Sequence, residues 1–210
     1  MGSGQRENGD VTTEIVDGEQ YEAARFVRIT AEQRDFAGVD FTDCLFDHCV
    51  FTECAFARCS FTDCRFVHCD LSIASFVGTR FTDVRFASCK LIGIDWAKAG
   101  DSRLSKLSLA VGFDDCLLNY GSFFGLALRR VRLAGCIARE ADFRDADLTE
   151  AVCTGTDFTG SKFLHTNLTK ANFTGATGYA INPTANVVTK ARFSLPEAIS
   201  LLSGFDVVIE

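Results

Sequence analysis

Cysteines are the residues of this chain with the most chemical potential, since thiolates bind zinc, form disulfides and act as nucleophiles. Nine of the ten follow five-residue spacing and stand two positions before a member of a regular apolar series: Cys44, Cys49, Cys54, Cys59, Cys64, Cys69, Cys89, Cys116 and Cys136. Zinc ligands instead come in close pairs that converge on one point. We therefore expect thiols that are buried along an extended structure, inert and free of metal.

Residues twenty positions apart, such as Cys44 and Cys64, could lie near disulfide distance. Their side chains should point in parallel, however, which suits a disulfide poorly. His48 and His68 have the same separation, but two histidines without a third ligand are weak support for a metal site. The sequence has no phosphate-binding glycine-rich loop, HExxH motif or Ser/His/Asp arrangement. We predict no catalytic residue and no cofactor, and hence a protein that is not an enzyme.

The apolar series that the cysteines accompany has a period of five. It comprises Tyr21, Phe26, Ala31, Phe36, Phe41, Phe46, Phe51, Phe56, Phe61, Phe66, Leu71, Phe76, Phe81, Phe86, Leu91 and Trp96, then Phe113, Leu118, Phe123, Leu128, Leu133, Ala138, Phe143, Leu148, Cys153, Phe158, Phe163, Leu168 and Phe173. A period of five matches neither a helix nor a strand. It indicates a repeat solenoid, in which each unit buries its side chains by stacking on its neighbours.

Each unit reads small–variable–Phe or Leu–polar–variable, as in Cys59-Ser60-Phe61-Thr62-Asp63. This pattern resembles the pentapeptide-repeat family over roughly residues 21 to 175. The resemblance implies an all-β solenoid, namely a right-handed quadrilateral β-helix in which four units make one square turn. It also implies that the large residue and the small residue two positions before it point inwards.

The repeat pattern and residue composition divide the chain into five parts. We expect an N-terminal lead-in and cap at 1–20, a first β-helix segment at 21–97, an irregular register-shift loop at 98–112, a second β-helix segment at 113–175 and a C-terminal cap and dimerisation module at 176–210. The seventeen residues from Trp96 to Phe113 are not a multiple of five. Either two extra residues form a bulge, or one step carries a twelve-residue excursion that could touch a partner.

The C-terminal part predicts a short helix followed by a strand. Ser194 and Glu197 resemble a capping box, and Gly204 is placed to end the helix. Residues 205–209 have the composition of a short strand. This apolar element could simply close the last turn, but we expect a homodimer seam because its apolar surface exceeds what one rod end can cover. The residues expected in that seam are Leu195, Ile199, Leu201, Leu202, Phe205, Val207, Val208 and Ile209.

Net charge and the length of apolar runs limit the kinds of partner this protein can have. The formal net charge is -7, which disfavours direct binding to nucleic acid. No apolar run approaches the ~20 residues of a membrane span, and the first twenty residues do not resemble a signal peptide. We expect a cytoplasmic protein without membrane contact.

Aspartates give the outer surface a possible function. Asp43, Asp63 and Asp83 should form one outward column, which Arg65 and Arg85 could neutralise to leave a compensated, solvated face. Further candidates, with fewer nearby cations expected, are Asp142, Asp147 and Asp157. Regularly spaced carboxylates along a rod could substitute for the phosphates of DNA.

The segment 191–199 resembles the same region of the gyrase-protecting group of the family, most closely its albicidin-immunity members and more distantly the microcin B17 immunity and Qnr-type members. This resemblance implies a dimeric DNA mimic that binds DNA gyrase, a type II topoisomerase. It would confer immunity or antibiotic resistance against a topoisomerase poison: an albicidin-like or other natural product, or a fluoroquinolone. Arg103 and Lys106 would be loop contacts. The alternatives are a non-catalytic scaffold for another protein, and ice binding through Thr42, Thr62 and Thr82.

Overall fold

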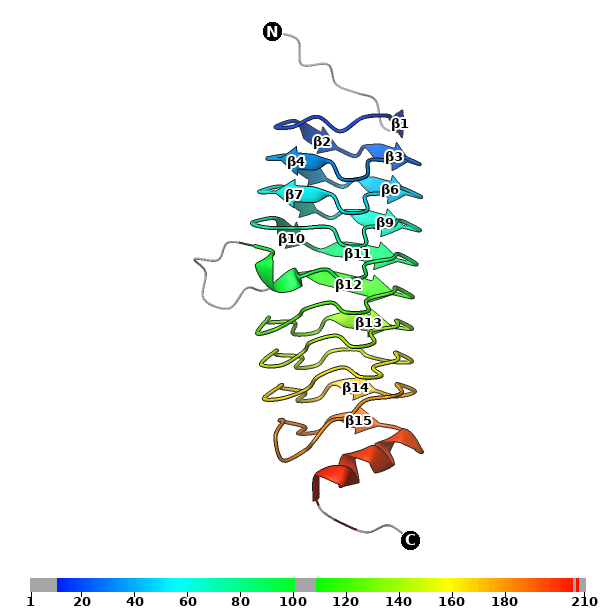
Figure 1. The fold of residues 1–210 in the computed structure, drawn as a ribbon, viewed down its shortest axis with the longest axis vertical. Helices are drawn as coiled ribbons and strands as arrows, with labels where there is room; N and C mark the ends of the chain where they lie inside the picture. Colours follow the sequence, from blue (N-terminus) through cyan, green and yellow to red (C-terminus); the bar gives the residue numbers. More distant parts are fainter. Residues whose placement is uncertain (1–10, 101–108, 206, 208–210) are drawn as a thin grey trace.

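A computed structural model describes residues 11–100, 109–205 and 207. It is a rod of stacked turns, with β1 at one end and the helix η2 at the other (Figure 1). The all-β solenoid predicted from the five-residue period is confirmed: every strand pair is parallel. The strands are β1 (Val11–Thr12), β2 (Gln20–Glu22), β3 (Arg25–Val27), β4 (Asp35–Ala37), β5 (Asp40–Thr42), β6 (Leu45–Asp47), β7 (Ala55–Ala57), β8 (Ser60–Thr62), β9 (Arg65–Val67), β10 (Arg80–Thr82), β11 (Val84–Ala87), β12 (Val111–Asp114), β13 (Arg132–Ala134), β14 (Asn172–Phe173) and β15 (Arg192–Phe193).

Each turn has four sides, which we name by one buried residue each: side A contains Phe41, side B Phe46, side C Phe51 and side D Phe56. Strands β2, β5, β8 and β10 stack on side A, strands β1, β3, β6, β9, β11, β12 and β13 on side B, and strands β4 and β7 on side D. Side C is joined by single bridges, beginning with Thr30↔Val50 and Val50↔Asp70. The four sides therefore form the predicted quadrilateral.

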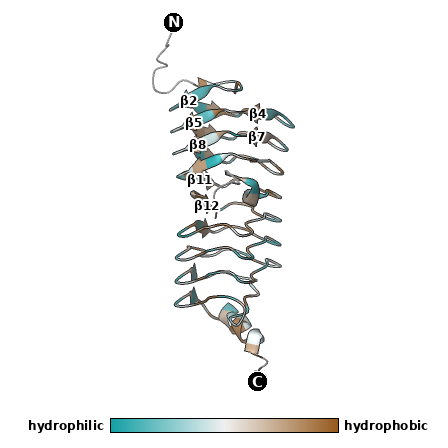
Figure 2. Cartoon of the chain, turned by 90° about the vertical axis from the view of Figure 1, so that its left-hand side faces the viewer, coloured by the Kyte–Doolittle hydropathy of each residue, from teal (hydrophilic) through white to brown (hydrophobic). Residues whose placement is uncertain are grey.

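Phenylalanines fill the interior in two geometries. Rings on the same side stack between turns, as with Phe41 and Phe61, whose centroids are 4.8 Å apart and whose planes differ by 5°. Rings on adjacent sides meet edge to face, as with Phe41 and Phe46 at 5.3 Å and 72°. Both are favourable aromatic arrangements. Hydrophobic and hydrophilic residues alternate along each turn, as Figure 2 shows, because the outward positions are mostly polar.

All ten cysteines are buried and free, so the burial expected from their spacing is confirmed. Their role is more specific than that of a compact apolar residue. The Sγ of Cys69 donates to the carbonyl of Phe46 at 3.4 Å and accepts from the N–H of Cys49 at 3.4 Å. The side chain thus ties a corner of one turn to the turn before it. The same donation to an earlier carbonyl is made by Cys44, Cys49, Cys54, Cys59, Cys64, Cys89, Cys116, Cys136, Thr79, Thr156, Ser161, Thr166 and Asn186.

Burial raises the pKa of the thiols of Cys59 and Cys153. A raised pKa keeps these thiols protonated, as a hydrogen-bond donor must be, and makes them poor nucleophiles.

One turn is longer than the others. Arg65 of β9 pairs with Arg85, twenty positions later, but Arg85 of β11 pairs with Gly112, twenty-seven positions later. The regular pattern continues to Gly100, whose N–H donates to the carbonyl of Thr79 at 2.7 Å, and the chain is again buried at Leu109. Seven additional residues are therefore inserted on side A, which corresponds to the twelve-residue step and not to a two-residue bulge.

Trp96, in the 3-10 helix η1 (Trp96–Lys98), lies in this longer turn. Its fully buried ring stacks on Phe76 at 5.5 Å and meets Phe81 and Phe113 edge to face. The largest side chain of the chain therefore fills the core where side A departs from the regular pattern.

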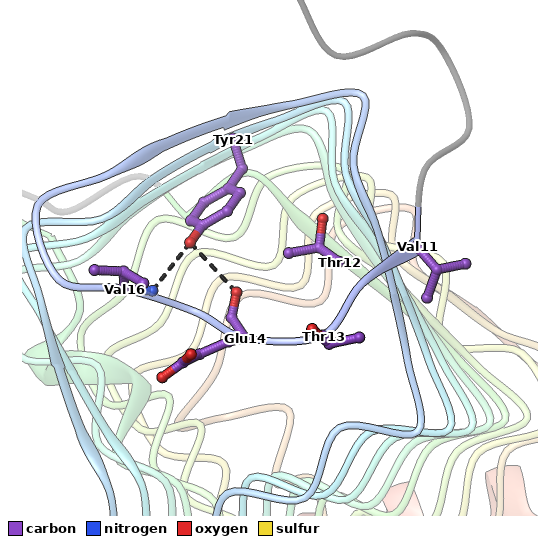
Figure 3. A pocket seen from close by; sticks show the side chains of 6 residues that line it. All are labelled: Val11, Thr12, Thr13, Glu14, Val16 and Tyr21. Carbon is purple, nitrogen blue, oxygen red and sulfur yellow. Dashed lines mark hydrogen bonds between the residues drawn. The ribbon is translucent and has the colours of Figure 1, made fainter. Parts of the chain in front are cut away.

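The N-terminal end of the core is covered by the segment 11–20. Ile15 is buried there, and the hydroxyl of Tyr21 accepts from the N–H of Val16 at 3.0 Å and donates to the carbonyl of Glu14 at 3.4 Å. Figure 3 shows this segment crossing the end of the rod, with the ring of Tyr21 directed towards it. The open cavity beside it, lined by Thr12 and its neighbours, is polar and shallow.

The C-terminal end differs in detail from the sequence prediction. A helix is present, but it is the 3-10 helix η2 (Glu197–Phe205), and Gly204 lies inside it instead of ending it. Ser194 does not form the expected capping box, because its Oγ accepts from the N–H of Gly175 at 2.9 Å. The strand predicted at 205–209 is not present at its two described residues: Phe205 belongs to η2 and Val207 is in no strand. The other residues of that range fall outside the described residues.

Replacement of Cys69 tests the hydrogen-bonding role of the buried thiols. We expect Cys69→Ser to retain the bond to Phe46, as Ser161 bonds to Ala138, and Cys69→Ala to lose it and leave a small void. The alanine variant should be less stable than the serine variant by about 1 kcal/mol. Urea unfolding followed by circular dichroism measures this, and an alanine variant as stable as the serine variant would contradict the role.

Candidate interaction surface

Asp43, Asp63 and Asp83 lie in one outward column on side A. Each follows a threonine of β5, β8 or β10, and these threonines are paired in register. The three aspartates have left-handed backbones, with φ of 52°, 53° and 51°, a conformation that aspartate tolerates better than most residues. The N–H of Asp43 is fixed by the carbonyl of Thr62 at 2.9 Å. The backbone therefore presents three exposed carboxylates one above another.

Arg65 and Arg85 form no ion pair with this column, so the expected neutralisation does not come from direct pairing. Both arginines lie in strands of side B, where their backbones pair with each other across β9 and β11. The guanidinium of Arg85 lies over Gly112, in space that a side chain at that position would occupy. Within the described residues, no Lys or Arg forms an ion pair with any of the three aspartates. Among the described residues, these three carboxylates are therefore unpaired.

The other three candidates do not join this column. Asp142 lies on side D, Asp147 on the C-terminal half of side A, and Asp157 on side C. The expectation of few nearby cations is wrong for them: Asp142 pairs with Arg144 at 2.6 Å, Asp147 with Arg129 at 3.2 Å, and Asp157 with Arg139 at 2.7 Å.

Asp147 and Asp157 also stabilise the backbone. Oδ1 of Asp157 accepts from the N–H of Thr159 at 2.9 Å and from its hydroxyl at 2.6 Å, and Asp147 does the same with Thr149. Asparagine makes the identical turn in the pairs Asn167–Thr169, Asn172–Thr174 and Asn182–Thr184. The recurring pattern Asp/Asn-x-Thr in the sequence is the signal that could have revealed this structural role.

Hydrogen bonds and ion pairs lower the pKa of the carboxyls of Asp142 and Asp157. The pKa of Asp142 is lowered chiefly by its bonds with the Arg144 guanidinium. At Asp157, burial raises the pKa, but the bonds from Thr159 and Arg139 outweigh burial and lower it. Both groups are therefore ionised as part of the folded structure.

Charge is compensated elsewhere on side A as well. In the C-terminal half, Glu150 lies between Arg130 and Lys170, with ion pairs of 2.9 Å and 3.0 Å. Over residues 11–100 the sequence has fourteen Asp and Glu against nine Lys and Arg, whereas over 109–205 it has nine of each. The uncompensated negative charge of the described rod therefore belongs to the N-terminal half.

The expected loop contacts Arg103 and Lys106 fall outside the described residues. So do two of the expected seam residues, Val208 and Ile209. Leu201 packs against the core of the rod. The remaining seam residues are exposed at the C-terminal end: Leu195, Ile199, Leu202, Phe205 and Val207.

The two stacked-turn histidines form no metal site with other described residues, and the described helices do not suggest a membrane-spanning segment. The rings of His48 and His68 lie on one face as expected, with centroids 4.8 Å apart and planes tilted by 42°. Nδ1 of His48 lies 2.7 Å from Oδ1 of Asp47. In the described ranges, no three His, Cys, Asp or Glu side chains gather closely enough to hold a metal ion. Nor does any helix of those ranges have the length and apolar character needed to cross a membrane.

Models of one family match the chain on both sides of the insertion. A pentapeptide repeat region matches residues 39–108, and pentapeptide repeats match residues 128–163 and 152–177. The chain belongs to the pentapeptide-repeat family. This agrees with the square turns, the inward phenylalanines and the small residue two positions before each.

Solved structures with a similar fold include a trypsin-treated variant of QnrB1, a plasmid-mediated fluoroquinolone resistance protein, with a TM-score of 0.59, 18% identity and coverage of 92% of this chain and 91% of that chain. Full-length QnrB1 gives a TM-score of 0.49 at 21% identity, covering 91% and 92%. HetL, a pentapeptide repeat protein of the cyanobacterium Nostoc sp. strain PCC 7120 involved in heterocyst differentiation regulation, gives 0.33 at 18% identity, covering 81% and 87%. No curated protein sequence matches the chain.

Acid titration tests the structural role of Asp157. Because its pKa is lowered in the folded state, its contribution to stability is present above the ordinary aspartate pKa of about 4 and is lost as the pH falls through the lower, folded value. Asp157→Asn has no such proton to bind and keeps the turn that Asn172 makes. Between pH 6 and pH 3, the melting temperature should fall further for the wild type than for the variant; an equal or larger fall in the variant would contradict the assignment.

Proposed function

We propose that this protein binds DNA gyrase, or a related type II topoisomerase, as a DNA mimic and so confers immunity or resistance to a topoisomerase poison. The observation that carries the proposal is the column of Asp43, Asp63 and Asp83, which no cation of the described residues neutralises. Like charges stacked between paired strands repel one another. A basic groove that normally holds DNA would relieve this repulsion.

The position of the column supports this function. It runs along side A towards Gly100, where the seven-residue insertion begins on the same side. A partner lying along the carboxylates would therefore also meet the insertion point. Loops carried on rigid scaffolds are frequent recognition elements.

Two likenesses support resistance as the outcome. The fold is shared with QnrB1, a fluoroquinolone resistance protein, and the segment 191–199 resembles that of albicidin-immunity proteins. Fold likeness alone does not determine function. We infer an albicidin-like natural product as the poison, because the sequence likeness is to that group.

Neutralisation of the column tests the proposal. The triple variant Asp43→Asn, Asp63→Asn, Asp83→Asn removes three charges, while asparagine retains the left-handed backbone. In a gyrase supercoiling assay, we expect the wild type to inhibit supercoiling, and its half-inhibitory concentration to rise about tenfold or more in the variant.

The matched control is Asp142→Asn, Asp147→Asn, Asp157→Asn, which changes the net charge equally but replaces aspartates that are already ion-paired. We expect it to inhibit gyrase as the wild type does. Equal loss in both triple variants would attribute inhibition to net charge, and retained inhibition in the first would remove the mimicry. A wild type that neither inhibits gyrase nor rescues it from any poison would favour a scaffold for another protein.

We also propose that η2 forms a homodimer seam. Ile199, Leu202 and Phe205 are 46%, 41% and 51% exposed, although they are large apolar residues on one short helix. Pairing with the same surface of a second copy would cover them with a closed, two-fold interface.

Substitution on η2 tests the seam. We expect Ile199→Ser with Leu202→Ser to convert a dimer into a monomer in sedimentation equilibrium, because the apolar contact area is lost. Leu164→Ser is the control, since Leu164 is similarly exposed, at 42%, but lies in the rod. An unchanged dimer mass in the double variant, or a monomeric wild type, would contradict the seam.

A further inference from the structure

Side B of the N-terminal half carries an arginine column that the proposed function does not use. Arg25, Arg65 and Arg85 occupy equivalent positions in β3, β9 and β11, with Leu45 of β6 between the first two. All three arginines are exposed. Arg28 stands nearby, at the outward turn position that His48 and His68 occupy in the next two turns.

These arginines have no carboxylate partner among the described residues. Further along the same column, Arg132 is paired with Asp114. On another side, Arg139 is paired with Asp157. Arg85 extends over Gly112, whose φ is not in the left-handed region, so that glycine provides room for the guanidinium and does not serve the backbone. The column is therefore a set of positioned, unneutralised guanidinium groups.

Apolar groups separate the arginines. Leu45, Val27 and Val67 are half-buried on the same side. Asp47 lies between the two valines, and its carboxylate is 2.7 Å from Nδ1 of His48. The surface therefore combines guanidinium groups, aliphatic contacts and one carboxylate that already has a neighbour. Guanidinium groups recognise carboxylates and phosphates through paired hydrogen bonds. Aliphatic contacts, in contrast, fit the side chains of a protein better than a phosphate backbone.

The neighbouring column argues against DNA. Asp63 and Asp83 stand two residues before Arg65 and Arg85, at the edge shared by sides A and B. A duplex is much wider than one groove of about 12 Å, so phosphates placed on the arginines would extend over these carboxylates and be repelled. A single extended or helical protein segment is narrow enough to remain on side B.

We propose that side B of the N-terminal half binds an acidic protein segment, whose carboxylates pair with Arg25, Arg65 and Arg85. The rod then has two adjoining surfaces of opposite charge. This inference goes beyond the proposed function, because it concerns a different side and a partner of opposite charge. Two adjoining surfaces of opposite charge also give specificity. A partner with a basic groove for the aspartate column but no carboxylates for the arginines would bind less well.

Peptide binding to the full chain tests this inference. The probe is a fluorescein-labelled octaglutamate peptide, followed by anisotropy at an ionic strength on the order of 0.01 M, where screening is weak. We expect the wild type to bind, and Arg65→Gln with Arg85→Gln to weaken binding about three- to tenfold. The control Arg58→Gln with Lys190→Gln removes two exposed cations from other parts of the rod and should bind as the wild type does.

Three outcomes would overturn the inference: no binding by the wild type, equal weakening in the control, or tighter binding to a 20-base-pair DNA duplex than to the peptide. The variant Asp43→Asn, Asp63→Asn, Asp83→Asn separates the two proposals. It should bind octaglutamate more tightly than the wild type, because neighbouring repulsion is removed, whether or not gyrase inhibition depends on those aspartates. Weaker peptide binding by that variant would count against side B as the binding surface.

Discussion

Hydrogen bonding between successive turns is the interaction on which the whole rod depends. A turn of twenty residues has no partner for its backbone except the turns on either side, and it can bury its phenylalanines only against theirs. This register fixes which residues point inwards. It also places outward residues twenty positions apart directly above one another, so that surface columns of one charge arise from the same periodicity as the core.

The register also constrains the surface more than its exposure suggests. Many outward positions before a large residue carry Asp or Asn to hold a threonine two positions later, as Asp157 holds Thr159. Outward positions two after it have left-handed backbones, which favour Asp, His and Gly. An aspartate of this rod is therefore available for recognition only where neither a threonine nor an arginine binds its carboxylate. Among the residues that the structure describes, the column of Asp43 meets that condition.

The five-residue period was sufficient to predict the solenoid, the inward phenylalanines and the burial of the cysteines, because these follow from stacking alone. It could not predict ion pairs within one side, such as Asp142 with Arg144, because they depend on side-chain conformation and not on the repeat. Nor could it predict how the C-terminal end closes, since no repeat continues there and Gly204 remains within η2. The thiol hydrogen bonds could have been predicted from the sequence. Thr79 and Ser161, which are hydrogen-bond donors, occupy the same position in their repeats as the cysteines do.

The insertion on side A leaves the other three sides continuous. Arg85 pairs with Gly112 on side B, Lys90 with Leu117 on side C and Asp95 with Ser122 on side D, all past the added residues. The pairing of these three sides thus does not depend on the length of that segment. Related proteins could have a longer, shorter or different segment here without disturbing the carboxylates before it. Binding specificity could therefore change at this insertion point while the rest of the rod stays the same.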